Sequence, residues 1–149
     1  MHTLLAILHV LLVVISVGPA MFMPWLGERA LRERDGDRVH QAGRRCMVFN
    51  ALTLAAALFG VLTTVTSDRY SFADPWIIIA STLYAVAVAN GAAVIPSVLA
   101  RIGKDLQDAH GVMDGELLEQ HRGRLLALAG LNVVFYTVVV ILMTWRPGA

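Results

Sequence analysis

Four long stretches of the chain lack charged residues, and their spacing predicts the elements of the fold. Residues 3–26, 46–66, 75–100 and 125–145 contain no Asp, Glu, Lys or Arg and are mostly apolar. Each stretch has about 20 residues or more, enough for a helix rising about 1.5 Å per residue to cross a hydrocarbon core of about 30 Å. We therefore predict an all-α membrane protein, a four-transmembrane-helix bundle that forms a single transmembrane domain over residues 1–149.

The composition supports this interpretation. The 149 residues are 57% hydrophobic and only 15% charged, whereas a soluble domain normally carries about 25% charged residues. A cleaved signal peptide is the alternative for the first stretch, but such a peptide begins with positive charge. Here the chain starts Met1-His2-Thr3 and the arginines follow the stretch instead. We therefore expect an uncleaved first span.

Lysine and arginine residues gather on one side of the predicted spans. Ten of the twelve lie in the first or the third loop, while the second loop holds only Arg69 and the C-terminal tail only Arg146. Short cytoplasmic loops carry an excess of Lys and Arg, so the N-terminus and the C-terminus should both lie outside. Trp76 and Trp145 at the predicted outer boundary and Trp25 at the inner one agree with this orientation, because Trp favours membrane interfaces.

The helices should continue beyond the bilayer on the basic side. Residues 27–34 are mostly good helix formers, and Asp37 can cap the second helix after a turn. In the third loop we expect polar helix to about Asp108, followed by a break at His110-Gly111. Alternating Arg and Glu or Asp over residues 28–38 is typical of an exposed, ion-paired helix, whose excess arginine could touch anionic lipid headgroups.

A weak internal repeat is also present. Residues 18–24 resemble residues 91–96, and residues 40–44 resemble residues 121–124. Both halves would run from outside to inside and back, so the repeat indicates a possible parallel duplication of a helical hairpin. Chance similarity is the alternative that such short matches leave open.

Small residues at helical spacing suggest where the helices touch. In lipid, packing replaces the hydrophobic drive, and small residues let helix backbones approach closely. We therefore predict helix–helix contacts, with Ala89 and Gly130 among them, at small residues on three spans. These are Ala56 and Gly60, then Ala85, Ala89 and Ala93, then Ala127 and Gly130.

Apart from the tyrosines, His9 is the titratable side chain that lies well inside a predicted span. It lies six residues from the outer end of its stretch, about 9 Å deep at 1.5 Å per residue. Tyr84 and Tyr136 each lie nine residues from their outer ends, so a polar cluster of these three residues is possible. An ionisable residue at membrane depth suggests function. Hydrogen bonding between helices, metal or haem ligation, and proton or substrate handling all remain open for His9.

Three asparagines lie toward the inner halves of the spans. Asn50, Asn90 and Asn132 are expected to hydrogen-bond to one another or to line a small polar cavity, and the structural role is the leading interpretation.

Other observations limit the possible chemistry. Bound haem usually needs two axial ligands, and His9 has no second histidine inside the predicted spans. The histidines of the loops match no zinc-ligand spacing, and Cys46 is the one cysteine, so no metal site is predicted. The spans hold no carboxylate that could couple transport to protons. A net charge of +1 gives no reason to expect a nucleic-acid partner.

The segment Leu4-Leu5-Ala6-Ile7-Leu8-His9-Val10, the later Val17-Gly18-Pro19 and the arginine-rich hairpin resemble a known family. Its members are small, four-span bacterial predicted integral membrane proteins, and the resemblance covers nearly the whole chain. It implies a multi-pass protein of the bacterial cytoplasmic (inner) membrane. More loosely, the chain is similar to the copper-resistance CopD and HemJ-type protoporphyrinogen oxidase membrane proteins. That similarity implies copper handling or tetrapyrrole chemistry at the histidine of the first span, here His9.

These observations favour a non-enzymatic membrane subunit, for example an accessory subunit of a respiratory complex. The expected partners are the lipid bilayer and other membrane subunits or further copies of the chain, and no cofactor is predicted. Two alternatives stay open. One is a redox protein that handles haem or copper with His9, and the other is a small-molecule carrier, suggested by the asparagines and the proline-containing spans.

Overall fold

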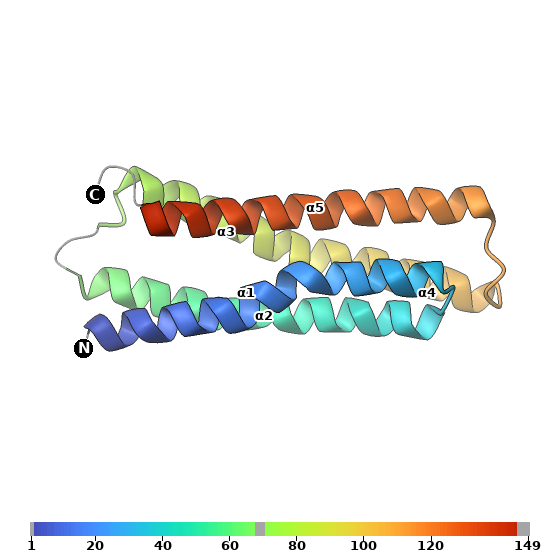
Figure 1. Cartoon of the computed structure of the whole chain (residues 1–149), viewed down its shortest axis with the longest axis horizontal. Coiled ribbons are helices and arrows are strands. Elements are labelled where there is room, and N and C mark those ends of the chain that lie inside the picture. The colour runs from blue at the N-terminus through green and yellow to red at the C-terminus, as the bar shows by residue number, and fades with distance from the viewer. Residues whose placement is uncertain (1, 68–70, 146–149) are drawn as a thin grey trace.

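The computed structural model describes residues 2–67 and 71–145, and the regular elements within them are all helical. Arg69 and Arg146, the two basic residues expected outside, fall outside this part of the chain. The elements, in chain order, are α1 (His2–Arg32), α2 (Gly36–Val65), α3 (Pro75–Ala89), the π-helical turn η1 (Asn90–Val94), α4 (Ile95–Asp108) and α5 (Gly115–Trp145). Since α3, η1 and α4 follow one another without a break, they form a single continuous span (Figure 1).

Within the described residues, four helical segments are long and apolar enough to cross a membrane. They are Thr3–Arg32, Gly36–Val65, Pro75–Asp108 and Gly115–Trp145. Their 30 to 34 residues correspond to about 45–51 Å of helix, which is longer than a hydrocarbon core. The all-α class and the four-span bundle are therefore confirmed. Both termini lie at one end of the bundle (Figure 1), as an even number of spans requires.

The opposite end, which we term the basic end, holds the connections between α1 and α2 and between α4 and α5 (Figure 1). Helix α2 begins after Asp35, whose carboxylate accepts a hydrogen bond of 3.0 Å from the Arg38 N–H. The prediction that Asp37 caps this helix was therefore wrong, because the chain leaves extended backbone two residues earlier. The predicted break after Asp108 is confirmed, with positive φ values at His110 and Gly111.

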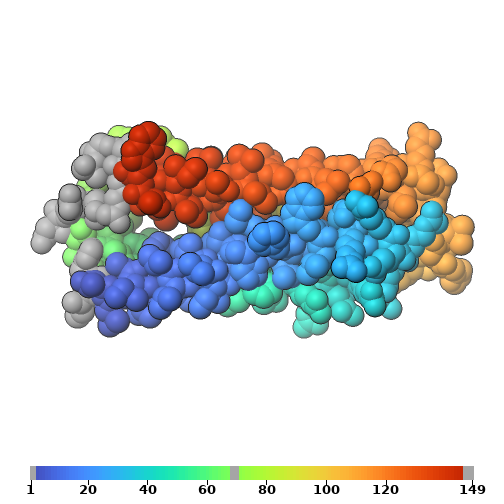
Figure 2. Space-filling view, in the orientation of Figure 1, coloured from blue at the N-terminus to red at the C-terminus, as the bar shows by residue number. Residues whose placement is uncertain are grey.

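The third span changes neighbours along its length. Helix α3 packs against α5 near the termini, whereas α4 packs against α2 toward the basic end (Figure 1). Helix α1 packs mainly on α2 and also on α5. In Figure 2, α1 and α5 touch along the middle of the molecule and toward the basic end. The third span therefore connects the two helix pairs.

The π-helical turn was not predicted, and it lies just before Pro96. Proline has no N–H, and in a regular α-helix its ring would collide with the carbonyl group of residue 92. The helix is wider here, and the Ile95 N–H bonds to the Asn90 carbonyl group five residues back. One extra residue in the turn brings Asn90 and Gly91 to buried positions facing the bundle.

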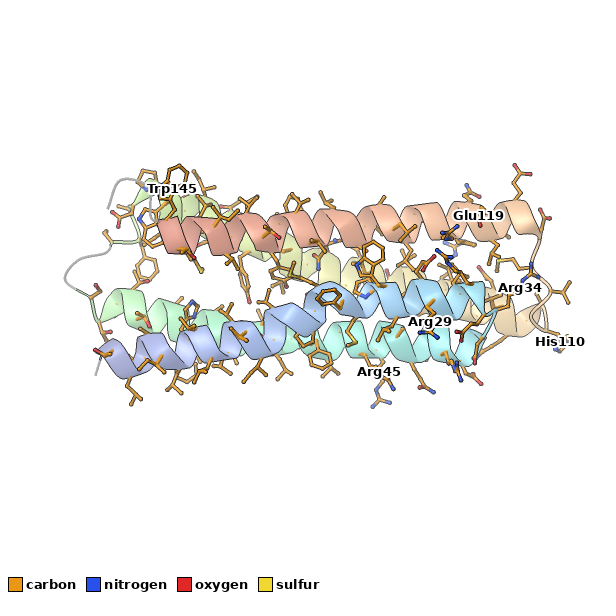
Figure 3. All side chains as sticks on the ribbon, in the orientation of Figure 1. Arg29, Arg34, Arg45, His110, Glu119 and Trp145 are labelled. Carbon is orange, nitrogen blue, oxygen red and sulfur yellow. The ribbon has the colours of Figure 1, made fainter. Side chains whose placement is uncertain are left out.

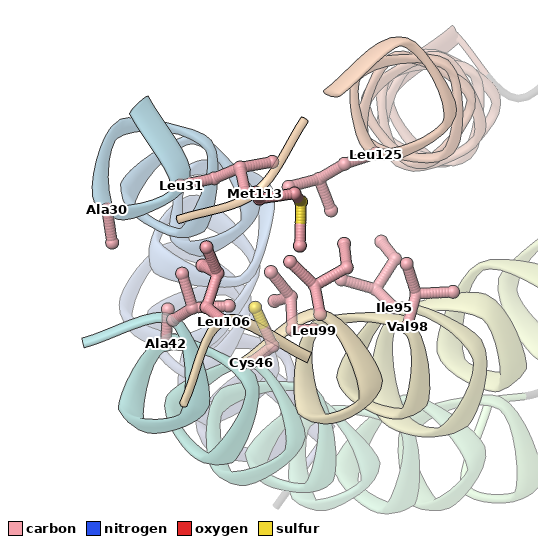
Figure 4. Packing of buried hydrophobic residues seen from close by; sticks show 12 residues of the cluster. Ala30, Leu31, Ala42, Cys46, Ile95, Val98, Leu99, Leu106, Met113 and Leu125 are labelled. Atoms are coloured by element: carbon pink, nitrogen blue, oxygen red, sulfur yellow. The ribbon is translucent and has the colours of Figure 1, made fainter. Parts of the chain in front are cut away.

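The largest hydrophobic core lies in the half of the bundle near the basic end (Figure 4). At its centre Leu99 packs against two helices at glycines. A Cβ at Gly27 would lie 2.7 Å from Leu99 Cδ2, and one at Gly43 would lie 3.2 Å from Leu99 Cβ. The buried residues of this core are Ala30, Leu31, Val39, Ala42, Cys46, Ile95, Val98, Leu99, Ile102, Leu106, Met113 and Leu125.

The predicted contacts at small residues are confirmed for α2 and wrong for the third and fourth spans. Ala56 is buried, and Gly60 faces the imidazole of His9. The three predicted alanines of the third span and Ala127 are exposed, and a Cβ at Gly130 would meet no atom within 4 Å. The small residues that are buried there are Ala80, Ala87, Gly91, Gly103 and Ala129. Helix α3 is apolar on every face, so its spacing alone could not identify the buried side.

Candidate functional site

Six polar side chains meet between α2, the third span and α5, and we term them the midspan network. Five of them are at most 7% exposed, and Tyr84 is half-buried. They come from four elements that are far apart in the sequence. The members are Asn50 and Thr53 of α2, Tyr84 of α3, Asn90 of η1, and Asn132 and Tyr136 of α5.

Hydrogen bonds within the network run from helix to helix. The Tyr136 hydroxyl donates to Asn50 Oδ1 at 2.8 Å, which joins α5 to α2. The Tyr84 hydroxyl donates to Thr53 Oγ1 at 3.0 Å, which joins α3 to α2. Asn90 Nδ2 donates to Asn132 Oδ1 at 3.3 Å and to the Leu128 carbonyl group at 3.1 Å, which joins η1 to α5. The network thus connects three of the four spans.

Further contacts fix the side chains of the network. Asn50 Nδ2 donates back to the Cys46 carbonyl group at 2.8 Å, and Thr53 Oγ1 donates to the Asn50 carbonyl group at 2.7 Å. The rings of Tyr84 and Tyr136 meet edge to face, with centroids 6.3 Å apart. Asn132 Nδ2 is buried without a hydrogen-bond partner among the described residues. Because hydrocarbon offers no alternative partner, such bonds favour association of these particular helix faces.

The structure regroups the two sets of residues expected from the sequence. Tyr84 and Tyr136 come together as expected, and Asn90 bonds to Asn132. Asn50 binds Tyr136, so one asparagine is bonded to the tyrosine group, whereas Asn90 and Asn132 bond to each other. Thr53, which sequence reasoning did not select, is a member because it lies one helical turn after Asn50.

His9 is placed apart from this network. Its Nδ1 lies 2.7 Å from the Ala56 carbonyl oxygen of α2. A carbonyl oxygen can only accept, so the Nδ1–H of His9 donates this hydrogen bond. A Cβ at Gly60 would lie 2.8 Å from Cε1 of the imidazole, so the glycine makes room for the ring. Among the described residues, no hydrogen bond joins His9 to Tyr84 or Tyr136. His9 therefore links α1 to α2.

A metal or haem at His9 can be tested against the ligands that surround it. The Nδ1–H bonded to a carbonyl group is an arrangement also found in metal-ligating histidines. However, no group of three His, Cys, Asp or Glu side chains in the described part of the chain could hold a metal ion.

A second polar cluster lies at the basic end. Glu28 of α1 is 7% exposed, and its carboxylate accepts hydrogen bonds from Arg32 Nε at 2.5 Å and from Arg122 Nε at 2.6 Å. Arg122 comes from α5 and also pairs with the exposed Glu119. The expectation of an exposed, ion-paired helix is correct for Arg29 and Glu33 and wrong for Glu28. Arg122 lies 94 residues from Glu28, so no local pattern could reveal this contact.

The chain matches the model of a family described as "Predicted integral membrane protein (DUF2269)" over residues 3–147. No curated protein and no solved structure matches it. The match agrees with the resemblance to small, four-span membrane proteins, and the looser similarity to CopD and HemJ-type proteins gains no support from it.

Proposed function

Because the chain belongs to the family of predicted integral membrane proteins DUF2269, we propose that it acts within the bilayer as a non-enzymatic subunit. In this role it packs against transmembrane helices of a larger membrane assembly, as an accessory subunit does. The midspan network supports the proposal, since its polar side chains are used to join helices of the bundle. A bundle held in this way presents fixed outer faces to neighbouring proteins.

One outer face of the third span carries the proposal. Ser81, Ala85 and Ala89 of α3 and Ala93 of η1 follow one another at four-residue spacing, and all four are exposed. Small residues at this spacing let a second helix approach closely, so that its backbone and side chains pack against the face. Larger apolar residues cover other exposed positions of α3, such as Ile78 and Ile79 at 52% and 51% exposure. We term the four small residues the α3 small face.

A crosslinker attached to the α3 small face tests the proposal in native membranes. Cys46 is the one cysteine and is fully buried, so Ala89→Cys adds one accessible thiol for a benzophenone maleimide. Illumination should then yield one discrete adduct larger than the chain. Val134→Cys on α5 is the matched control, because this position is 55% exposed and lies on another helix.

The pattern of crosslinked adducts tests whether the α3 small face packs against another subunit. A discrete protein adduct from position 89 that is absent from position 134 supports the proposal. Mass spectrometry of the adduct then shows whether the neighbour is another protein or a second copy of the chain. If both positions give only lipid adducts, or the same mixture of proteins, the α3 small face does not pack against a subunit and the proposal fails.

A further inference from the structure

An open groove runs between α1 and α2 at the level where the helices leave the predicted membrane. Its first part has a volume of about 300 Å³ and is lined by Leu26, Arg29, Glu33, Arg38, Gln41 and Arg45, together with two alanines. A second hollow of about 200 Å³ shares Gln41 and Arg45 with the first and adds Arg44, Val48 and Phe49. We term the two hollows together the α1–α2 groove.

Positive charge is in excess on the membrane side of the groove. Glu33 accepts hydrogen bonds from Arg29 at 3.2 Å and from Arg38 at 2.8 Å, which neutralises much of the first part. Arg44 and Arg45 are exposed, and no carboxylate among the described residues pairs with either of them. Figure 3 shows Arg45 projecting outward from α2, away from the bundle. These two guanidinium groups therefore remain available to an anion.

The polarity of the groove changes over one helical turn. Arg44 and Arg45 immediately precede the charge-free stretch 46–66, which places them at the depth of lipid headgroups. Val48 and Phe49 follow within the apolar stretch, and Val48 is 48% exposed. Across the groove Leu26 is 44% exposed on α1. The cationic part of the groove therefore lies next to an apolar part, as the charged headgroup of a phospholipid lies next to its acyl chains.

We propose that the α1–α2 groove binds an anionic phospholipid of the leaflet at the basic end. The guanidinium of Arg45 binds the headgroup phosphate, because its planar set of donors matches phosphate oxygens. Arg44 adds a second positive charge, and the Gln41 amide donates to a further oxygen. An acyl chain lies along Val48 and Phe49. This binding does not depend on whether the α3 small face contacts another protein.

Native mass spectrometry of the purified full chain in detergent tests the site directly. The probes are a phosphatidylglycerol, a phosphatidylcholine with the same acyl chains, and inorganic phosphate. We expect one phosphatidylglycerol to be retained preferentially over phosphatidylcholine. Because a basic residue near the surface adds about fivefold to anionic lipid binding, Arg45→Ala should lower this retention about fivefold. Arg44→Ala/Arg45→Ala should lower it about 25-fold.

Arg124→Ala is the matched control, because Arg124 is exposed at the same end of the bundle but does not line the groove. It should retain phosphatidylglycerol as the unchanged chain does. Equal retention by Arg45→Ala and Arg124→Ala would overturn the site. Binding of inorganic phosphate as tight as that of phosphatidylglycerol would overturn its assignment to a lipid. Thermal unfolding of each variant, followed with a thiol-reactive dye at Cys46, shows that a loss of lipid does not come from misfolding.

Discussion

Replacing Gly91 with alanine should destabilise the bundle through a single collision inside the midspan network. A Cβ at this position would lie 2.1 Å from Oδ1, 2.5 Å from Cγ and 2.6 Å from Nδ2 of Asn50. Asn50 is fully buried and holds hydrogen bonds of 2.8 Å to Tyr136 and to the Cys46 carbonyl group. It cannot turn away from the new methyl group without losing these bonds.

The expected loss follows from two contributions. Overpacking a tightly packed interior costs about 1–3 kcal/mol. A hydrogen bond between membrane helices contributes about 0.6 kcal/mol on average, and the bond between Tyr136 and Asn50 is at risk. The free energy of unfolding of Gly91→Ala should therefore fall by about 2–4 kcal/mol. Gly130→Ala is the matched control, because its Cβ would meet no atom within 4 Å. Its unfolding free energy should change by less than about 1 kcal/mol.

The cause can be isolated with a double-mutant cycle. In an Asn50→Ala background the colliding side chain is absent, so adding Gly91→Ala should cost less than about 1 kcal/mol. Unfolding in detergent can be followed with a thiol-reactive fluorophore, since Cys46 is fully buried until the bundle opens. Loss of helical circular dichroism gives a second readout that does not depend on Cys46. The collision does not limit stability if Gly91→Ala unfolds like Gly130→Ala, or if its cost is the same in both backgrounds.

Four further predictions concern single contacts and the topology. Tyr136→Phe should lower the unfolding free energy by about 0.6 kcal/mol and at most about 1.7 kcal/mol, measured with the same dye, because one hydrogen bond between helices is lost. His9→Gln should change the unfolding free energy by no more than about 0.6 kcal/mol. The substitution should not remove a Soret band from the spectrum of the purified protein. Glu28→Gln should cost about 1.5–3 kcal/mol in a urea titration, whereas Glu119→Gln on the exposed side of Arg122 should cost less than about 0.5 kcal/mol. A reporter fused after Trp145 should be active only outside the cytoplasm, and a cytoplasmic signal would reverse the orientation assigned from the basic residues.

The spans could be predicted from the sequence because charge is excluded from hydrocarbon. Charge-free stretches of sufficient length leave few alternatives, and the break at His110-Gly111 follows from local turn chemistry. The side of each helix that faces the bundle could not be predicted in this way. Ala87 and Ala89 are equally apolar and lie two residues apart, yet Ala87 is buried and Ala89 is exposed. In a helix that is apolar all round, only contacts with other helices decide which side is buried.

The candidate site was partly predictable for the same reason. Polar side chains inside a span must find partners, so selecting Asn50, Tyr84 and Tyr136 from the sequence identified members of the network. Which partner each one finds depends on distances between helices. The π-helical turn, which lies just before Pro96, brings Asn90 toward α5. His9 bonds to a backbone carbonyl group instead, and a backbone acceptor has no signature in the sequence.

The third span packs against different helices along its length, and this affects how the bundle is completed in the membrane. Its half near the termini packs against α5 and its half near the basic end packs against α2, so neither hairpin of the chain is complete by itself. Without the third span, the space beside Gly27 and Gly43 lacks the Leu99 side chain that fills it in the bundle. Arrival of the third span fills this space, but its Tyr84 ring reaches Tyr136 only after α5 has inserted. The packing of all four spans is therefore complete only when α5 is in place.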